Sequence, residues 1–356
     1  MQAYIIDLSD SHEWESELNL FSENQRDIYF TPHYYRLHEV NGDGKASCFI
    51  FKEGHDIAMY PFLKNSINEL ELLDLDKHYW DIQGAYGYNG IVSSTYEKGF
   101  VRSFHKHFCE LCSNSNIVCE FTRSHPLLQN EAFFEGWLDV KFNRKTVMID
   151  LTQGYEKIWN ESYSSTNRNM LRKAQKNNLM AVEGKDQKDY DRFFELYTKT
   201  MTNVNASDFY FFNKMYFQNF KELLDQYHKL IWIKHQDTYV CGILLMYDGQ
   251  FAHYHLSARD KEYSKLAINN LALDTAVKYA IELGCQVLNL GGGVSSSETD
   301  SLLRFKKDFS KLTNDFYIAT RVHNREIYMN LCNTWIMKYG EQFKDKQHLF
   351  LRYRQQ

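Results

Sequence analysis

The sequence predicts a mixed α/β fold of two tandem domains, each with a mixed, mostly antiparallel sheet flanked by helices. The chain has 356 residues, enough to bury two hydrophobic cores. Antiparallel strands, a helix and a further strand follow one another in residues 1–150, and the same order returns in residues 151–356. The length and this repeated order together place the domain boundary near residue 150.

Apolar alternation and turn signals predict the elements of the first half in order. A strand at residues 3–8 leads to a helix that begins near Ser11. Residues 46–64 alternate between apolar and polar side chains on both sides of Glu53-Gly54-His55, which is typical of a hairpin. This half is completed by a helix over 96–112 and by strands at 116–123 and 145–152.

The second half repeats the order. We expect a strand at 179–184, followed by helices over 189–201 and about 212–226. Residues 229–258 contain three strands, separated by turns at 235–237 and 248–250. A long helix then ends at Gly284, a suitable residue after a helix end, and the wholly apolar strand 285–290 is typical of a sheet covered on both faces.

Composition and charge narrow the class of protein. The net charge is −5 and the pI is near 6.3, which argues against nucleic-acid binding over the whole surface but allows a local basic groove. No apolar run reaches about 18 residues, so we expect no membrane span. The N-terminal residues resemble a strand and a helix cap rather than a signal peptide, and seven cysteines without framework spacing favour the reducing cytoplasm.

One cysteine cluster allows two interpretations. His105, Cys109 and Cys112 are spaced to share a helix face, and Cys119 would be a fourth zinc ligand. The alternative is a helix that packs small apolar thiols inward. We favour the second interpretation because two well-separated ligand pairs are missing, and we predict no metal.

The stretch after strand 285–290 predicts an anion-binding turn. The strand stops at Gly291-Gly292-Gly293, and Ser295 precedes Glu298 by the three residues of a capping box. A helix from about Ser295 to Phe309 would point its N-terminal amides at this turn. We therefore predict that Asn289, Gly291 and Gly292 bind substrate; a plain tight turn is the alternative.

Lys306 occupies an unexpected place on this predicted helix. A wheel at about 100° per residue puts Leu302, Phe305 and Phe309 on one side, and Lys306 lies between Leu302 and Leu303. A lysine inside an apolar arc must extend its amine to the surface, pair with another group or line a cavity.

Basic and aromatic side chains supply further candidates. Arg168, Arg172 and Lys176 form one stripe of a helix, which either holds phosphates or is a solvated face. Tyr86 and Tyr88 lie in a glycine-rich loop, where their rings either stack on a sugar or phosphate-bearing ligand or cover the seam between domains.

The central strand of the second half and the loop after it bear on catalysis. In "AHYHLSA", His253 and His255 share one face and Tyr254 takes the other; either kind of side chain could move a proton. Before the long helix, "RDKEYSKLAINN" lacks the glycines typical of an acetyl-CoA pyrophosphate loop, although helix amides alone can bind phosphate.

Several of these segments together resemble the FemABX family, the peptidoglycan-bridge aminoacyltransferases and related acetyltransferases of polysaccharide loci. The closing motif is "LNLGGG" followed by "DSLLRFKKDFS". "SSTNRNMLRKAQKNNLMAVEG", "DIQGAYGYNGIVSS" and "FAHYHLSA" are similar to the family's arginine-containing helix, its aromatic-glycine loop and its central strand. The resemblance covers residues from about 80 to 322.

The resemblance implies two GNAT-like domains: 1–150, which binds the acceptor, and 151–356, which carries the transfer site and a C-terminal helix. It implies that Phe305 and Lys306 are the pair whose lysine helps acyl transfer, and it favours Arg168 and Tyr254 among the other candidates. The chain departs from the family pattern at Ser310, where glycine is frequent, and it has no coiled-coil arm.

The sequence therefore predicts an acyltransferase with Lys306 and Tyr254 as catalytic residues. It would move an aminoacyl or acyl group to an amine of a nucleotide- or lipid-linked peptidoglycan or polysaccharide precursor. The donor would be aminoacyl-tRNA, bound by its 3′ end, or acetyl-CoA acting on an amino sugar, with no tightly bound cofactor. The non-enzymatic alternative is a twin-domain module that binds a glycan or a partner protein.

Overall fold

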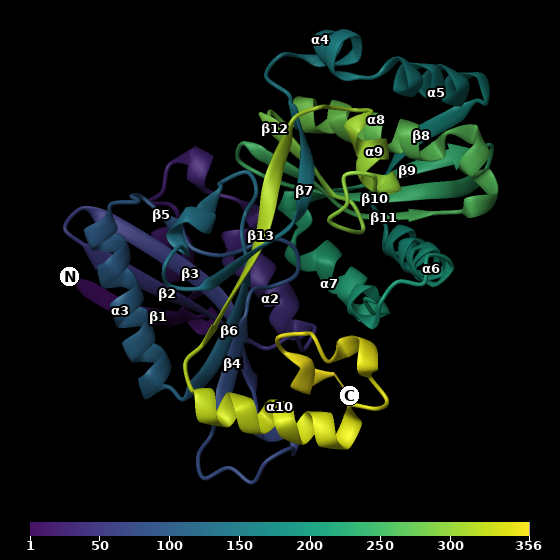
Figure 1. The fold of residues 1–356 in the computed structure, drawn as a ribbon. Helices are drawn as coiled ribbons and strands as arrows, with labels where there is room; N and C mark the ends of the chain where they lie inside the picture. The colour runs from purple at the N-terminus through teal and green to yellow at the C-terminus, as the bar shows by residue number, and fades with distance from the viewer. Residues whose placement is uncertain (356) are drawn as a thin grey trace. The chain divides into compact units, whose positions relative to one another are not determined.

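The computed structural model describes residues 1–355, which divide into two compact units (Figure 1). The first unit contains residues 1–25, 29–143 and the chain from Phe316 onward. The second unit contains Arg26–Ile28 and Arg144–Asp315. The predicted boundary near 150 is close to the first crossing between the units, but the chain also returns to the first unit near its end.

The first unit contains one sheet whose strand order is β1-β2-β3-β4-β6-β13, with β5 paired to β3. All neighbouring strands are antiparallel except β4 and β6. The strands are β1 (Gln2–Asp7), β2 (Lys45–Glu53), β3 (Asp56–Ser66), β4 (Trp80–Gln83), β5 (Val92–Ser93), β6 (Ile117–Arg123) and β13 (Thr313–Val322). The helices are α1 (Ser11–Leu18), α2 (Pro32–Val40), α3 (Lys98–Asn114) and α10 (Arg325–Tyr339).

Aromatic side chains form the main core of the first unit. Phe100, Phe104 and Phe108 recur at i, i+4 and i+8 on α3, so they line one face of that helix. They pack against Phe49 and Phe51, which alternate on β2 and therefore point to the same side of the sheet. The predicted hairpin of β2 and β3 thus has one face buried under the predicted helix.

The chain from Phe316 onward corrects the predicted domain limits. We expected everything after 150 in the second domain, but β13 pairs antiparallel with β6, and Ile318 lies opposite Arg123. Helix α10 then contributes Leu331 and Trp335 to a hydrophobic cluster that contains Val118 of β6. The partner of a strand is set by packing distant in sequence, so the order of elements alone did not predict this return.

The second unit contains one sheet with the strand order β7-β12-β11-β10-β9-β8, in which only β11 and β12 are parallel. The strands are β7 (Asp139–Asp150, whose first residues belong to the first unit), β8 (Leu179–Gly184), β9 (His228–His235), β10 (Thr238–Asp248), β11 (Phe251–Arg259) and β12 (Val287–Gly292). The helices are α4 (Tyr155–Lys157), α5 (Ser165–Lys176), α6 (Gln187–Asn203), α7 (Lys214–Leu223), α8 (Ile268–Glu282) and α9 (Ser301–Lys307).

Helices cover both faces of this sheet (Figure 1). Helix α8 is buried along most of its length and packs Ala272, Ala276 and Val277 against β9 and β10. Helices α6 and α7 lie on the opposite face in Figure 1, and α6 contacts β11. This two-sided cover explains why β10 and β12 have apolar runs rather than alternation. Within residues 1–355, no helix combines the length and the apolar character needed to cross a bilayer.

Candidate functional site

The predicted turn at the end of β12 depends on its glycines. Gly291 has φ 72°, in the left-handed region that glycine adopts without strain. A Cβ on Gly292 would lie 2.7 Å from both the Cδ atom of Arg144 and the carbonyl oxygen of Lys145. Only glycine allows β7 and β12 to approach this closely, so the chain can turn abruptly out of the sheet.

Asp300 holds the loop that follows the turn. Its Oδ2 atom accepts hydrogen bonds from the backbone amides of Val294 and Ser295, at 3.1 and 3.0 Å. Its Oδ1 atom accepts from the amides of Leu302 and Leu303, at 2.9 and 3.0 Å, and so caps helix α9. One carboxylate therefore fixes both the loop and the start of the helix.

The predicted helix start at Ser295 is wrong. The helix begins at Ser301, because Asp300 rather than Ser295 is the N-cap. Glu298 forms an ion pair with Lys307, at 2.8 Å, instead of closing a capping box with Ser295. The amides expected to bind an anion are occupied by the Asp300 carboxylate, so the turn has no open helix N-terminus.

Lys306 is buried, and its amine bonds to the turn. Leu303 and Lys306 are the buried residues of α9, and Phe309, just after the helix, is buried as well, whereas Leu302, expected on that face, is 37% exposed. Lys306 Nζ donates to the carbonyl oxygen of Gly292 at 2.7 Å. The burial leaves the ammonium with little solvent, so its charge depends on the protein groups around it.

A second cation bonds to the same turn and lowers the pKa of Lys306. Arg144 Nη1 donates to the carbonyl oxygens of Gly293 and Val294, at 2.7 and 3.2 Å. Burial, and then the positive charge of Arg144, lower the pKa of Lys306 to about 7, although Asp300 acts in the opposite direction. The amine therefore titrates near neutral pH, in the range that suits proton transfer or charge stabilisation.

Tyr254 on β11 lies beside this amine. Lys306 Nζ is 5.9 Å from the centroid of the Tyr254 ring. Burial raises the pKa of the Tyr254 phenol, so it stays protonated at neutral pH and can donate a hydrogen bond. Phe305 is half-buried and packs edge-on against Phe309, with 5.6 Å between ring centroids. The structure thus brings together Lys306, Tyr254 and Gly292.

Asn289 is buried beneath the turn, and both ends of its carboxamide face protein groups. Its Oδ1 atom accepts from the amide of Gly291 at 2.9 Å, and its Nδ2 atom lies 3.4 Å from Nδ1 of His253. This arrangement fits a role in shaping the turn; the binding role predicted for Asn289 would need these contacts to break.

The two predicted arginines of α5 have different surroundings. Arg168 Nη1 donates to the carbonyl oxygens of Trp159, Asn160 and Tyr163, so it closes the π-helical turn that precedes α5. Arg172 is exposed and lies over the ring of Trp159, with 5.9 Å to the ring centroid. Arg172 is therefore the more accessible of the two to a ligand.

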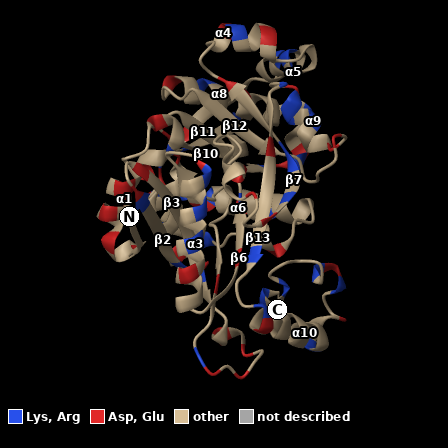
Figure 2. Cartoon of the chain, turned by 60° about the vertical axis from the view of Figure 1, so that its left-hand side comes forward, with Lys and Arg blue, Asp and Glu red and all other residues tan. Residues whose placement is uncertain are grey.

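Helix α5 carries a basic surface. Its residues 165–176 include four cations and no acidic side chain; the cations are Arg168, Arg172, Lys173 and Lys176. Figure 2 shows the blue of Lys and Arg on α5. The amide of Ser164, the N-cap of α5, donates to the carbonyl oxygen of Asp308 at 2.8 Å. The start of α5 thus contacts the end of α9, the helix that carries Lys306. Such a surface suits phosphate groups.

The predicted tyrosines belong to the first unit. The backbone oxygen of Tyr86 accepts a hydrogen bond from Tyr34 at 2.7 Å. The ring of Tyr88 makes edge contacts with Tyr29 and Phe316, each with 5.3 Å between ring centroids. Their ligand-binding role stays a prediction.

The four residues weighed as zinc ligands do not meet. His105 Nε2 bonds to the carbonyl oxygen of Phe133 at 2.7 Å, and the Cys119 thiol contacts the Tyr353 hydroxyl at 3.1 Å. Among the described residues, the ligating atoms of His105, Cys109, Cys112 and Cys119 form no cluster within 4.8 Å of one another.

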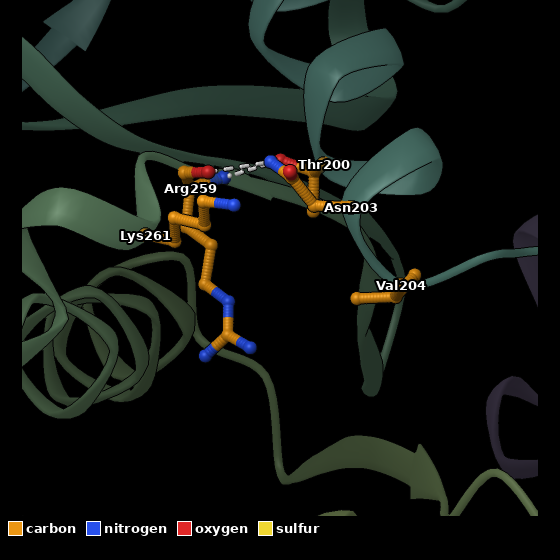
Figure 3. Close-up of a pocket in the computed structure, with 5 residues that line it drawn as sticks. All are labelled: Thr200, Asn203, Val204, Arg259 and Lys261. Carbon is orange, nitrogen blue, oxygen red and sulfur yellow. Dashed lines mark hydrogen bonds between the residues drawn. The ribbon is translucent and has the colours of Figure 1, made fainter.

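A small cavity that the sequence did not predict lies between the end of α6 and the end of β11. It measures about 150 Å³ and is lined by Thr200, Asn203, Val204, Arg259 and Lys261. Figure 3 shows the hydroxyl of Thr200 bonded to the backbone of Arg259, with the guanidinium extending away from these bonds. Within residues 1–355, no group hydrogen-bonds to that guanidinium, so the cavity suits an anionic group.

The start of α8 combines two features of a phosphate-binding helix. Ala267, at the N-cap, has φ 67°, the left-handed conformation that glycine usually supplies. No side chain caps the helix there. The missing glycine noted in the sequence is therefore replaced by an alanine in a glycine-like conformation, which sequence reasoning could not anticipate.

Comparisons with known proteins define the class. Residues 162–307, within the second unit, match the family model described as "Acetyltransferase (GNAT) domain". The solved structure titled "Crystal structure of FemX" is similar over 92% of this chain and 99% of its own, with TM-score 0.67 and 14% identity. A search of the curated proteins gave no match.

Two further solved structures share the fold. The C-terminal domain of a putative lysylphosphatidylglycerol synthetase from Agrobacterium fabrum matches over 92% of this chain and 97% of its own, with TM-score 0.54 and 13% identity. A tandem GNAT protein from the clavulanic acid biosynthesis pathway matches over 90% of this chain and 99% of its own, with TM-score 0.51 and 10% identity. The predicted resemblance in fold to FemABX and GNAT-like proteins and the tandem GNAT-like fold are therefore confirmed, and the match of residues 162–307 to the GNAT family model supports the predicted acyltransferase class.

Proposed function

We propose that this acyltransferase moves an aminoacyl or acyl group to an amine of a peptidoglycan or polysaccharide precursor. The observation that carries the proposal is Lys306, a buried amine that titrates near pH 7 beside Tyr254 and the glycine turn. The similarity of the whole fold to FemX supports the envelope precursor as acceptor.

The chemistry needs no covalent enzyme intermediate. The acceptor amine attacks the carbonyl carbon of the donor ester or thioester and forms a tetrahedral intermediate with a negatively charged oxygen. The protonated amine of Lys306 stabilises that oxygen, and the phenol of Tyr254 donates to it or to the leaving group. The carbon–oxygen or carbon–sulfur bond then breaks, and the acceptor nitrogen loses its proton to water.

The test of Lys306 uses a volume-conserving variant. We expect Lys306→Met to lower kcat by about 10²- to 10³-fold, because one charge-stabilising donor is lost at the developing oxyanion. Lys307→Met, next to it and paired with Glu298 at the surface, serves as the matched control. Multiple-turnover assays measure kcat of both variants, and circular dichroism checks that both are folded. An unchanged kcat in Lys306→Met removes this lysine from the mechanism.

Two donors fit different surfaces. The basic helix α5 favours aminoacyl-tRNA, whose phosphates would contact Arg172, Lys173 and Lys176. The GNAT family model and the uncapped start of α8 at Ala267 favour acetyl-CoA, whose phosphates would lie at that helix end.

Thermal shift with each donor separates the two. Stabilisation by acetyl-CoA that persists at 0.3 M salt indicates the CoA donor. Stabilisation by charged tRNA that weakens steeply with salt, and in Arg172→Gln, indicates the tRNA donor.

A further inference from the structure

We propose that Asp27, His253 and Asn289 form a buried positioning chain that fixes the glycine turn and, through it, the amine of Lys306. The inference rests on the proposed function in one respect, namely that a displaced Lys306 amine lowers the rate of acyl transfer. None of the three is a catalytic residue in this proposal; each acts on Lys306 through the backbone of residues 291–292.

The chain begins with a buried carboxylate. Asp27 lies in the short segment Arg26–Ile28 that belongs to the second unit. Its Oδ2 atom is 2.7 Å from Nε2 of His253, and the side chains of Asp27 and His253 are 0% and 2% exposed. A carboxylate without solvent needs a hydrogen-bond donor, so the imidazole presents Nε2–H to Asp27.

The tautomer of His253 then sets the orientation of Asn289. A neutral imidazole that donates through Nε2 has an acceptor at Nδ1. The carboxamide nitrogen of Asn289 faces that atom at 3.4 Å, and the two residues are register partners on the parallel strands β11 and β12. This orientation leaves the carboxamide oxygen of Asn289 to accept the amide of Gly291, at 2.9 Å.

The bond to Gly291 controls the backbone that holds Lys306. The pairing of β12 with β7 shifts register between Asn289 and Gly291, so the sheet ladder alone does not fix this point. Gly291 takes its left-handed φ here, and the next carbonyl, of Gly292, accepts the amine of Lys306. A reversed Asn289 carboxamide would place two donors opposite each other at Gly291 and release the turn.

An isosteric variant tests the direction of this chain. In Asp27→Asn the carboxamide presents either its oxygen or its nitrogen to Nε2; where the nitrogen donates, the imidazole proton moves to Nδ1 and Asn289 must reverse. We expect kcat to fall by about tenfold to hundredfold with little change in KM, because the ammonium of Lys306 is misplaced rather than removed. We also expect a changed titration midpoint of Lys306 in nitrogen-15 NMR.

The double variant Asp27→Asn/Asn289→Asp provides the rescue. Its new carboxylate accepts both Nδ1–H of His253 and the amide of Gly291, so the turn re-forms with the charge moved rather than lost. We expect kcat of the double variant to return to within about threefold of the wild-type value. The titration midpoint of Lys306 should return close to that of the wild type. Asp237→Asn, in the exposed turn between β9 and β10, controls for the loss of one acidic charge.

Direct observation of the histidine keeps the proposal falsifiable if Asp27→Asn fails to fold. Nitrogen-15 NMR of the wild-type protein should show His253 with its proton at Nε2 and an unprotonated Nδ1. Protonation of the wild-type His253 at Nδ1 overturns the proposal. Wild-type kcat and Lys306 titration in a folded Asp27→Asn whose His253 is protonated at Nδ1 also overturn it, as does a double variant that stays impaired. The tautomer and the Lys306 titration do not depend on turnover, so they test this chain even if Lys306→Met proves the proposed function wrong.

Discussion

Lys306 imposes a stability cost that depends on pH. Burial and the charge of Arg144 lower the pKa of Lys306 from its usual 10.5 to about 7 in the folded protein. Between these two values the unfolded chain binds a proton that the folded protein does not, so the free energy of unfolding rises with pH from about 7 to 10.5. Below pH 7 both states are protonated, and the full cost of burying the charge remains.

We therefore expect Lys306→Met to stabilise the protein, and to do so more at pH 6.5 than at pH 9.5. Urea unfolding at the two pH values measures the difference between variant and wild type at each. The hydrogen bond to Gly292 is donated by an ammonium at pH 6.5 and by a neutral amine at pH 9.5, and the lowered pKa of Lys306 already contains this difference. A stability gain that stays constant, or grows, toward pH 9.5 contradicts the lowered pKa; Lys307→Met is the matched control.

Among the helices, α9 owes its position to one cap. The carboxylate of Asp300 accepts four backbone amides, two from the loop and two from the first turn of the helix. Asp300→Ala should lower the free energy of unfolding by about 2 kcal/mol, the upper end for loss of an N-cap, because the loop amides lose their acceptor as well. Asp300→Asn keeps one carbonyl oxygen and should lose less.

Chemical denaturation of the two Asp300 variants compares these losses. The same samples should show faster hydrogen exchange at Leu302 and Leu303 in Asp300→Ala than in Asp300→Asn. Equal stability of wild type and Asp300→Ala would mean that α9 is held by its buried face alone.

The sequence predicted those elements whose signal is local. The β2–β3 hairpin and helix α8 were predicted because alternation, turn residues and helical periodicity all lie within the segment itself. The start of α9 was mispredicted because Ser295 and Glu298 have capping-box spacing, while the competing cap, Asp300, gains from loop amides that no local pattern reveals. Lys306 was identified from its place among apolar residues. Its hydrogen bond to the carbonyl oxygen of Gly292 was not predicted.

The positioning of Asn289 could not be predicted for a related reason. Its contacts come from His253, on a strand 36 residues earlier, and that histidine is bonded to Asp27, 226 residues earlier. Such contacts follow from sheet order rather than from spacing in the sequence. Arg259 was missed because one arginine at a strand end carries no motif.

The last described residues of the chain pack into the first unit and bond to a buried carboxylate there. Tyr353 donates to Oδ2 of Asp81 at 2.9 Å, and Arg354 Nε contacts both carboxylate oxygens, at 2.7 and 3.0 Å. Asp81 lies on β4 and is fully buried. Burial raises the pKa of its carboxyl, whereas Arg354 and Tyr353 act to lower it. The C-terminal segment therefore supplies the charge that a buried carboxylate of the N-terminal half requires.

Removing that charge should unfold the first unit more easily. Arg354→Met leaves the Asp81 carboxylate buried without a cationic partner, so we expect the free energy of unfolding of this unit to fall by about 3–5 kcal/mol at pH 8. The loss should be smaller at pH 5 than at pH 8, because without Arg354 burial raises the pKa of this carboxyl further and protonation removes the uncompensated charge. Asp81→Asn/Arg354→Met should recover most of the stability at pH 8. Hydrogen exchange at the amides of β4 and α10, measured at increasing denaturant, reports this unit. Equal losses at the two pH values would show that Arg354 acts by packing and not by charge.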